Sequence, residues 1–300
     1  MSAFTAINLE KLAAPEIVNR SDFETVLGEV KAWLIAREPG LGPVLALESE
    51  PIVKVIEAWA YRETLLRAEV DDAGRGNMLA FAVGPQLDHL AAFFGVQRAI
   101  VQAADPDAVP PVPEILETDA RLRQRTQLAL EGFTTAGSRG AYVFWGLSAS
   151  PLVKDIGILS PTPGRVDATV LSTSGDGVPD AALLTAVAAQ LNHEDVRPLT
   201  DLVVVQPATI INYTIDASLI MYDGPDAAVV RQAAETAVRA YVSENHLLGH
   251  DITVSGLHAA LHQPGVQNVN LTSPAANIVV SPTEAAFCTS VSVTFGGVDV

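Results

Sequence analysis

The hydrophobic residues of the first hundred positions recur every three or four residues, which predicts helices. A first helix follows Ser21, which begins a capping box completed by Glu24. A second helix is expected over residues 48–70, and two shorter helices over residues 75–83 and 85–94. Trp33 and Leu34 continue the apolar stripe of the first helix. The stripe of the second helix consists of Ile52, Val55, Ile56, Trp59 and Leu66.

Proline interrupts this helical pattern over residues 103–118, which contain Pro106, Pro110, Pro111 and Pro113. Prolines at this density prevent a helix and favour an extended, stiff chain. We therefore expect a linker at residues 103–118 and a domain boundary there. Helical spacing returns over residues 119–149, with an interruption at the Gly132 that follows Glu131.

The period changes to two at Pro151, which predicts strands from there on. The first group of elements has the order β-β-α-β, and a second group follows with a long strand whose alternate residues, from Ile211 to Met221, share one face. The expected elements of the first group are strands at 153–159 and 165–172, a helix at 180–192 and a strand at 202–206. Those of the second group are a strand at 209–222, helices at 226–247 and 254–261, and strands at 266–271 and 286–295.

These elements predict an α+β fold class in an elongated chain of several domains, each small sheet having helices on one face. An N-terminal helical region of residues 1–102 is followed by the proline-rich linker of residues 103–118. A middle domain, helical and then β-β-α-β, is expected over residues 119–206. A C-terminal α+β domain is expected over residues 207–300.

The composition excludes several classes of protein. The apolar fraction of 49% is too high for a disordered chain, and Cys288 is the only cysteine, which excludes an internal disulfide framework. A net charge of −17 argues against a nucleic-acid partner, because phosphate binding needs clustered Lys and Arg. The first 16 residues have no basic segment before an apolar one, and no apolar run is long enough to span a bilayer. We expect a soluble protein that is made in a cytoplasm and has no membrane partner.

No motif for catalysis or for a cofactor is complete. His246 and His250, and likewise His258 and His262, have i,i+4 spacing but lack the glutamate that a zincin carries after its first histidine. The glycines near residue 140 do not form a phosphate loop, and Cys288 lies in a predicted strand, where a small buried hydrophobe is expected. The expectation is a protein that is not an enzyme, with no cofactor and no metal. An enzyme whose catalytic residues are scattered over a sheet stays an alternative, as does an isolated soluble binding module.

Several segments along the chain together form a recognisable series. They are LALESEPIVK at 45–54, AYRETLLR at 60–67, GPQLDHLA at 84–91 with FGV at 94–96, RQR at 123–125, EGF at 131–133, GSRGAY at 137–142, NHEDVRPLTD at 192–201 and GV at 265–266. These segments resemble the baseplate J-like family, the wedge proteins of contractile phage tails and related injection particles. They occur in the family's order from about residue 15 to residue 295, and the segment at 192–201 is the most specific.

The resemblance implies an architectural role. Two copies of the chain would associate through their N-terminal helices with a different, smaller wedge protein. The C-terminal domains would join neighbouring wedges into a six-fold ring around a hub. That ring would hold the sheath and change conformation to trigger contraction in the baseplate of a virion or particle tail, assembled in the bacterial host cytoplasm. The resemblance does not distinguish a phage tail from a bacteriocin or another injection particle.

Two groups of residues are candidates for function. Apolar side chains on the two long N-terminal helices are expected to contact partner helices, because short helices cannot bury all of them against each other. The segment after the helix at 180–192 is expected to be a structural corner, in which Pro198 sets the direction of the chain; a ligand or ion bound by its charged residues is the alternative. The interface candidates are Trp33, Ile52, Val55, Trp59 and Leu66, and the corner residues are Asp195, Arg197, Pro198, Thr200 and Asp201.

Overall fold

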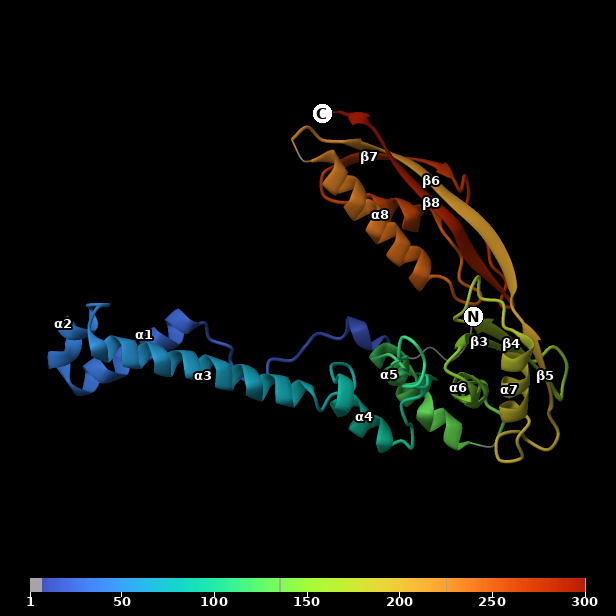
Figure 1. Cartoon of the computed structure of the whole chain (residues 1–300), viewed down its shortest axis with the longest axis horizontal. Helices are drawn as coiled ribbons and strands as arrows, with labels where there is room; N and C mark the ends of the chain where they lie inside the picture. Colours follow the sequence, from blue (N-terminus) through green and yellow to red (C-terminus); the bar gives the residue numbers. More distant parts are fainter. Residues whose placement is uncertain (1–6, 135, 225, 300) are drawn as a thin grey trace. The chain divides into compact units, whose positions relative to one another are not determined.

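The computed structural model describes residues 7–134, 136–224 and 226–299 of the 300-residue chain. The chain divides into two compact units, which are best taken separately (Figure 1). Of the described residues, the N-terminal unit contains 7–98 together with 118–126. The sheet unit contains residues 99–117 and the chain from residue 127 onward. Helices and small sheets together confirm the predicted α+β class, whereas the boundaries of the individual domains stay a prediction.

A helical hairpin forms most of the N-terminal unit. After the short η1 (Leu9–Lys11), α1 (Phe23–Arg37) is followed by η2 (Pro39–Leu41), α2 (Gly42–Leu45) and the long α3 (Pro51–Arg75). Helices α1 and α3 lie side by side (Figure 1). Their shared core is small and entirely aliphatic. It consists of Val26, Leu27, Leu45, Val53, Ile56 and Ala60, with Phe23, Val30, Leu34 and Leu41 packed around them.

The start of α1 differs from the predicted capping box by one residue. Asp22 is the N-cap, because its backbone is extended and its carboxylate accepts a hydrogen bond from the Thr25 amide at 2.8 Å. This hydrogen bond is the largest of the interactions that lower the pKa of Asp22. Ser21 instead donates its hydroxyl to Asn19. The prediction of Ser21 as the cap was therefore wrong, since the neighbouring aspartate is an equally good acceptor.

The structure differs from the prediction at residues 75–83 as well, because the expected helix is absent there from the described part of the chain. Helix α3 continues to Arg75, and residues 76–81 form turns before α4 (Gly84–Ala92). Arg123 replaces the missing helical hydrogen bonds, because its guanidinium donates to the carbonyls of Leu79 and Ala82 at 2.8 and 2.7 Å. Arg123 belongs to α5 (Asp119–Leu128), whose first residues complete the N-terminal unit.

Residues 103–118 do not form the extended spacer that their prolines predict. The chain folds back on itself, so that β1 (Ile100–Gln102) pairs antiparallel with β2 (Ile115–Leu116). Asp105 and Val112 extend the ladder by exchanging two backbone hydrogen bonds of 2.9 Å. The prolines do exclude a helix here, as predicted, but they lie in the far part of a hairpin. Pairing between such short strands has no signature in the local hydrophobic pattern.

The first sheet of the sheet unit has the predicted β-β-α-β order. After η3 (Ala129–Phe133) and α6 (Arg139–Ala149), β3 (Val153–Leu159) pairs antiparallel with β4 (Arg165–Ser172). The chain crosses over through α7 (Ala181–Leu191), and β5 (Leu202–Pro207) pairs parallel with β4. The sheet order is therefore β3-β4-β5. Ser138 caps α6 and Asp180 caps α7, each accepting a hydrogen bond from the amide three residues later.

The second sheet also has three strands. The long β6 (Thr209–Met221) lies between β7 (Val266–Ser273) and β8 (Glu284–Val298), antiparallel to the first and parallel to the second. Helices α8 (Ala227–Glu244) and α9 (Val254–Leu261) pack against the sheet. The predicted inward face of β6 is confirmed, since alternate residues along the strand enter the core between this sheet and its helices. They are Tyr213, Ile215, Ala217, Leu219 and Met221, with Ile211 partly buried at the end.

The two sheets contact each other directly within the sheet unit. Ala208, between β5 and β6, donates its amide to the carbonyl of Val170 at 2.9 Å. Asp155 of β3 accepts the amide of Leu248 at 3.0 Å. Leu171, Ala208 and Ala285 are buried together at this junction. The junction therefore has both hydrogen bonds and an apolar core.

Candidate interaction surface on the N-terminal helices

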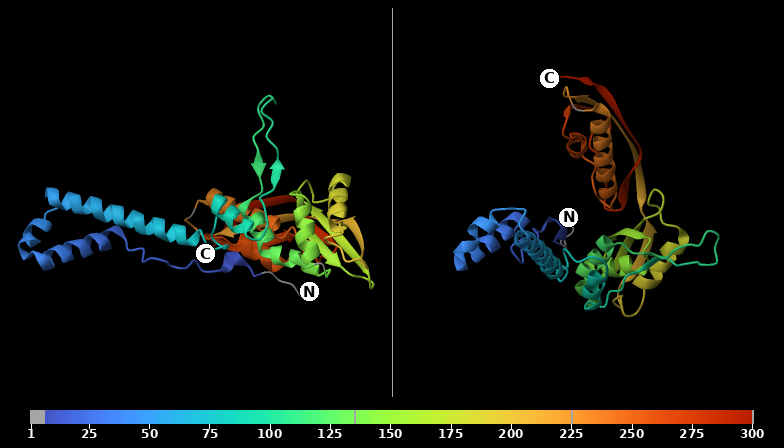
Figure 2. Two further views of the ribbon diagram at one scale, coloured as in Figure 1. Left: turned by 90° about the horizontal axis from the view of Figure 1, so that it is seen from below. Right: turned by 60° about the vertical axis from the view of Figure 1, so that its left-hand side comes forward.

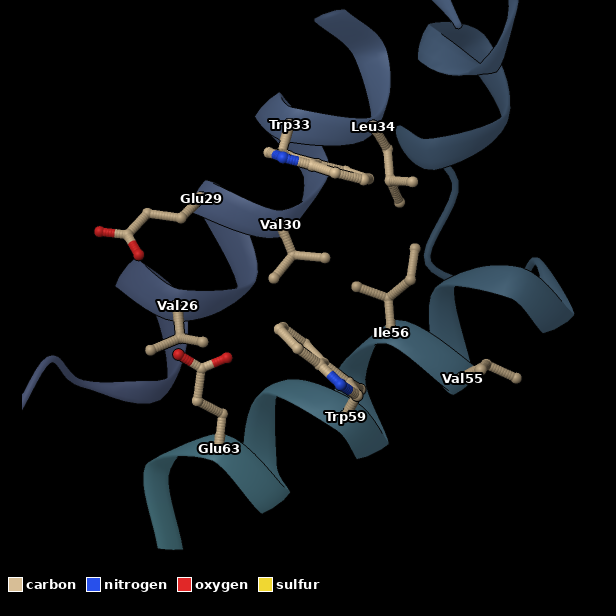
Figure 3. Close-up of a pocket in the computed structure, with 9 residues that line it drawn as sticks. All are labelled: Val26, Glu29, Val30, Trp33, Leu34, Val55, Ile56, Trp59 and Glu63. Atoms are coloured by element: carbon tan, nitrogen blue, oxygen red, sulfur yellow. The ribbon is translucent and has the colours of Figure 1, made fainter. Parts of the chain in front are cut away.

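A groove of about 500 Å³ runs between α1 and α3 (Figure 3). It arises because the buried residues of the two helices lie at the bottom of the hairpin, while larger apolar residues stay above them. Trp33 points into the groove from α1, and Trp59 points into it from α3. The lining is almost wholly apolar, with one carboxylate on each helix at the border. It consists of Val26, Glu29, Val30, Trp33, Leu34, Val55, Ile56, Trp59 and Glu63.

The large side chains of this groove are unusually exposed for their hydrophobicity. Trp33 is 55% exposed, Trp59 53% and Val55 68%. The guanidinium of Arg37 lies 3.6 Å from the centroid of the Trp33 ring, a cation–π contact that holds the indole in place. Contiguous exposed apolar surface of this kind is typical of a protein–protein interface. The groove is therefore suited to receive an apolar helix face.

A second hollow of about 400 Å³ adjoins the groove along α3 and has a more polar border. Leu66, which is 59% exposed, lines it together with Trp59. Arg67 forms an ion pair with Glu63 one turn earlier on the same helix. Charged residues thus border the apolar strip on α3, in the manner of the polar rim that surrounds the apolar centre of an interface.

Four of the five predicted interface residues line these two hollows. Trp33, Val55 and Trp59 line the groove, and Leu66 lines the adjoining hollow. Ile52 is also exposed but lies outside both. The prediction omitted Val26, Val30 and Leu34 of α1, although their helical spacing is visible in the sequence. What the sequence does not show is which side of α1 faces α3. The role of all these residues in an interface stays a prediction.

An ion cluster fixes the other end of α3. Asp71 is fully buried and binds Arg20 at 2.6 Å and Arg75 at 2.9 Å. The other oxygen of Asp71 accepts a hydrogen bond from the Ile17 amide at 2.9 Å. This hydrogen bond lowers the pKa of Asp71 most, and the charges of the two guanidiniums lower it further. The segment before α1 is thereby fastened to α3, which keeps the two helices of the groove in register.

The predicted corner residues do not converge on one point. Asp195 is exposed beside His193, whereas Arg197 donates to the backbone carbonyl of Asp201. The carboxylate of Asp201 accepts the hydroxyl of the buried Tyr142 at 2.8 Å. Thr200 is exposed. The segment therefore connects to α6 through the pair of Tyr142 and Asp201, and its role as a corner stays a prediction.

A glycine supports this connection. Gly137 has a φ of +74°, and a Cβ there would lie 2.7 Å from the Pro198 ring and 2.9 Å from the Asp201 carboxylate. Only glycine allows this close approach. Burial, and after it the hydrogen bond to Asp201, raises the pKa of Tyr142 well above its usual value, so the hydroxyl stays protonated and keeps donating at neutral pH.

The ionisable side chains at the junction of the two sheets serve packing. His246 is buried, its Nδ1 donates to the carbonyl of Ala286 at 2.8 Å, and its ring lies edge-on to Phe287. Burial lowers the pKa of His246 and raises that of the half-buried Cys288. A thiol with a raised pKa is a poor nucleophile. Within the described part of the chain, no three His, Cys, Asp or Glu residues are grouped as metal ligands, and no helix has the length and hydropathy of a membrane span.

Three family models match successive parts of the chain. The baseplate J-like N-terminal domain matches residues 48–105, the baseplate J-like central domain matches residues 134–207, and the C-terminal domain of baseplate J-like proteins matches residues 213–294. The groove-forming α3 lies inside the first match, the first sheet lies inside the second match, and most of the second sheet lies inside the third.

Two known proteins give the extent of the similarity. Baseplate protein J of Escherichia phage P2 is 44% identical over 298 residues, which are 98% of this chain and 99% of that protein. Among solved structures, the six-fold symmetrised cryo-EM structure of the anti-feeding prophage baseplate contains a chain with a TM-score of 0.43 and 16% identity. That match covers 63% of this chain and 47% of the other.

Proposed function

This chain belongs to the baseplate J-like family, and we propose that it is a structural wedge protein in the baseplate of a contractile tail. The observation that supports this most strongly is the identity of 44% to a phage baseplate protein along almost the whole of both chains. At this identity and coverage the matched regions of the two chains share one fold.

The α1–α3 groove supports the same assignment from the physical side. Its two half-exposed tryptophans and its long apolar strip are costly to leave in water, and burying such a surface is the main favourable contribution to association. In this proposal the groove receives helices of a second copy of the chain and of a different, smaller wedge protein. A helix in a groove of this kind is held by apolar residues repeating at helical spacing.

The sheet unit joins neighbouring wedges in this proposal. A ring needs heterologous contacts, in which one chain presents two different surfaces to its two neighbours. Wedges joined in this way form a six-fold ring around the hub, which holds the sheath and changes conformation to start contraction. The chain would act in the tail baseplate after assembly in the host cytoplasm. This role is architectural and requires neither a catalytic residue nor a cofactor.

Complementation of a particle-producing strain tests the proposal. The gene for this chain is deleted and replaced by a copy that carries a short affinity tag, and purified particles are labelled with gold against the tag. Electron microscopy should show label at the baseplate end of the tail, and the deletion strain should produce no complete contractile tails. Tails that assemble and contract without the chain would contradict the proposed function.

A further inference from the structure

The hairpin of residues 100–116, here called the arm, has no buried side chain of its own. All residues of β1 and β2 are exposed, and Ala108 and Val112 are the most covered residues between the strands. Figure 2 shows the arm extending away from the ribbon around it in both views. A two-stranded hairpin without a packed face is only marginally stable in water. Its exposed aliphatic residues are Ile100, Val101, Val109, Ile115 and Leu116.

Specific contacts nevertheless give the arm a defined shape. At its base, Glu117 is buried and exchanges two hydrogen bonds with the backbone of Ala99, one from each partner's amide. At its far end, the carboxylate of Asp105 accepts the amides of Asp107 and Ala108 at 3.2 Å, which closes a turn. A structure held at both ends while its sides stay in water is prepared for a partner that covers the sides.

Prolines restrict how the arm can be used. Pro106, Pro110, Pro111 and Pro113 lack an amide hydrogen and fix φ, so this part cannot add a strand to the edge of another sheet. They also reduce the conformational freedom that would be lost on binding. The arm is therefore suited to insertion by its side chains. Val109, which is 98% exposed next to two of these prolines, is the most prominent apolar group.

The acidic charge of the arm favours a partner surface that carries Lys or Arg. Asp105, Asp107 and Glu114 are its only charged side chains, and no lysine or arginine lies between Arg98 and Arg121. A second copy of this chain carries 35 acidic residues against 18 basic ones, so it offers few surfaces on which Lys and Arg predominate. We propose that the arm inserts into an apolar cleft bordered by Lys and Arg on a different protein of the baseplate. The inference rests on the proposed function, which supplies the assembly in which that protein occurs.

Site-specific cross-linking in assembled particles tests the arm. Val109 is replaced by the photoreactive p-benzoylphenylalanine in the complementing copy, the particles are irradiated, and the cross-linked peptides are identified by mass spectrometry. The expected product joins residue 109 to a different baseplate protein, at a segment where Lys or Arg flanks apolar residues. A cross-link only to a second copy of this chain, or none at all, would overturn the proposal.

Charge variants sharpen this test. In D105N/D107K/E114K, asparagine keeps the acceptor that closes the turn while the charge of the arm is reversed, and the cross-link should fall about tenfold. The milder D107N/E114Q should give an intermediate loss. The matched control E194K/D223K/E244Q makes the same change in net charge at three exposed acidic residues elsewhere in the sheet unit and should cross-link like the parent. An equal loss in the control would show that only net charge matters and would refute the arm as the site.

The two proposals fail in different ways. If the chain is absent from purified baseplates, the proposed function is wrong. If it is present but residue 109 does not cross-link to a different baseplate protein, only the arm proposal is wrong. The composition of the particles and the cross-link are measured on the same sample, so one experiment separates the two outcomes.

Discussion

Replacing Trp59 by alanine removes the largest apolar group that α3 contributes to the groove. The indole is 53% exposed, and its covered part lies against Ile56 and the facing α1. In the free chain the exposed half contributes nothing to folding. In a complex it is buried, so the substitution should weaken association more than it destabilises the chain.

The size of the effect follows from the exposed area. A tryptophan side chain buries roughly 200–250 Å² when fully covered, so the exposed half of Trp59 corresponds to roughly 100–130 Å². At about 25 cal/mol per Å² this is about 3 kcal/mol. Ordering and imperfect packing at the interface reduce it to about 1.5–3 kcal/mol. Since about 1.4 kcal/mol corresponds to a tenfold change, the dissociation constant should rise roughly 10- to 100-fold.

The assay measures binding of the purified chain to the different, smaller wedge protein of the proposal, by titration calorimetry and by light scattering after size exclusion. Phe93→Ala is the control, because Phe93 is 86% exposed in the same unit but lies outside the groove. If exposed area alone governed the effect, Phe93→Ala would weaken binding at least as much as Trp59→Ala. We expect it to change binding less than twofold.

Two results would refute this reasoning. If Trp59→Ala binds like the parent while its melting temperature is unchanged, the groove is not the interface. If Trp59→Ala and Phe93→Ala lose the same affinity, the effect is one of general hydrophobicity. If Trp59→Ala instead unfolds the N-terminal unit, Trp59→Phe gives the decisive measurement, since it keeps the ring that covers Ile56 while removing part of the exposed surface.

Three further predictions concern the sheet unit. Tyr142→Phe removes the hydroxyl that donates to Asp201 and should lower the free energy of unfolding by about 1.5–3 kcal/mol in denaturant titration. The control Tyr222→Phe, at a half-exposed tyrosine, should change the free energy of unfolding by less than about 0.5 kcal/mol. Equal losses in the two variants would contradict the role of the Tyr142 hydroxyl. Burial lowers the pKa of His246, so on acidification the imidazole is protonated in the unfolded chain before it is protonated in the folded chain. The free energy of unfolding should therefore be unaffected above about pH 6.5 and should decrease as the pH falls from there through the folded pKa of His246. If the melting temperature of His246→Gln decreases between pH 7.5 and 5.5 as much as that of the parent, His246 is not the cause. Arg197→Ala should lower the melting temperature of the sheet unit by removing its bond to the Asp201 carbonyl, and a metal or small molecule found by native mass spectrometry that is lost with this change would overturn the corner interpretation.

Periodicity predicted the sheet unit well because most of its elements are long and buried on one side. The expected strands at 153–159 and 165–172 coincide with β3 and β4, and the expected helix at 254–261 coincides with α9. β3 buries Val153, Ile156 and Ile158, and α9 buries Leu257 and Leu261 on one side, whereas β4 is buried at nearly every residue after Arg165. The inner residues of β6 lie in the core for the same reason. Local pattern is sufficient where one face of an element is covered.

The failures occurred where distant contacts decide the structure. Residues 76–81 form turns, and Arg123 binds the carbonyls of Leu79 within them and Ala82 after them, 44 and 41 positions away in sequence. The arm depends on pairing between strands of three and two residues, too short for any period to be recognised. Arg98 likewise joins Asp88 of α4 to Asp119 of α5, at 2.7 Å each. Such contacts leave no trace in the local hydrophobic pattern.

The candidate site was predictable in part for the same reason. Helical spacing places Trp33 and Trp59 on apolar stripes, and the large exposed fractions of both side chains agree with the expectation that the stripes exceed what the hairpin buries. The groove itself exists only because α3 lies against a particular side of α1. That choice follows from small residues such as Ala60 and Val53, which allow close packing on one side of α3. The larger residues are left on the open side.

Charge connects the two proposed contact surfaces. Glu29 and Glu63 border the groove, and the arm carries only carboxylates. At physiological salt, charges farther apart than about 8 Å are largely screened, so the net charge of −17 does not by itself prevent copies of this chain from meeting. Acidic groups placed directly at a contact still act at short range. They penalise a second acidic surface and favour one that carries Lys or Arg. Contacts between identical copies must therefore rely on the apolar floor of the groove, whereas contacts with a different protein gain from its acidic border as well.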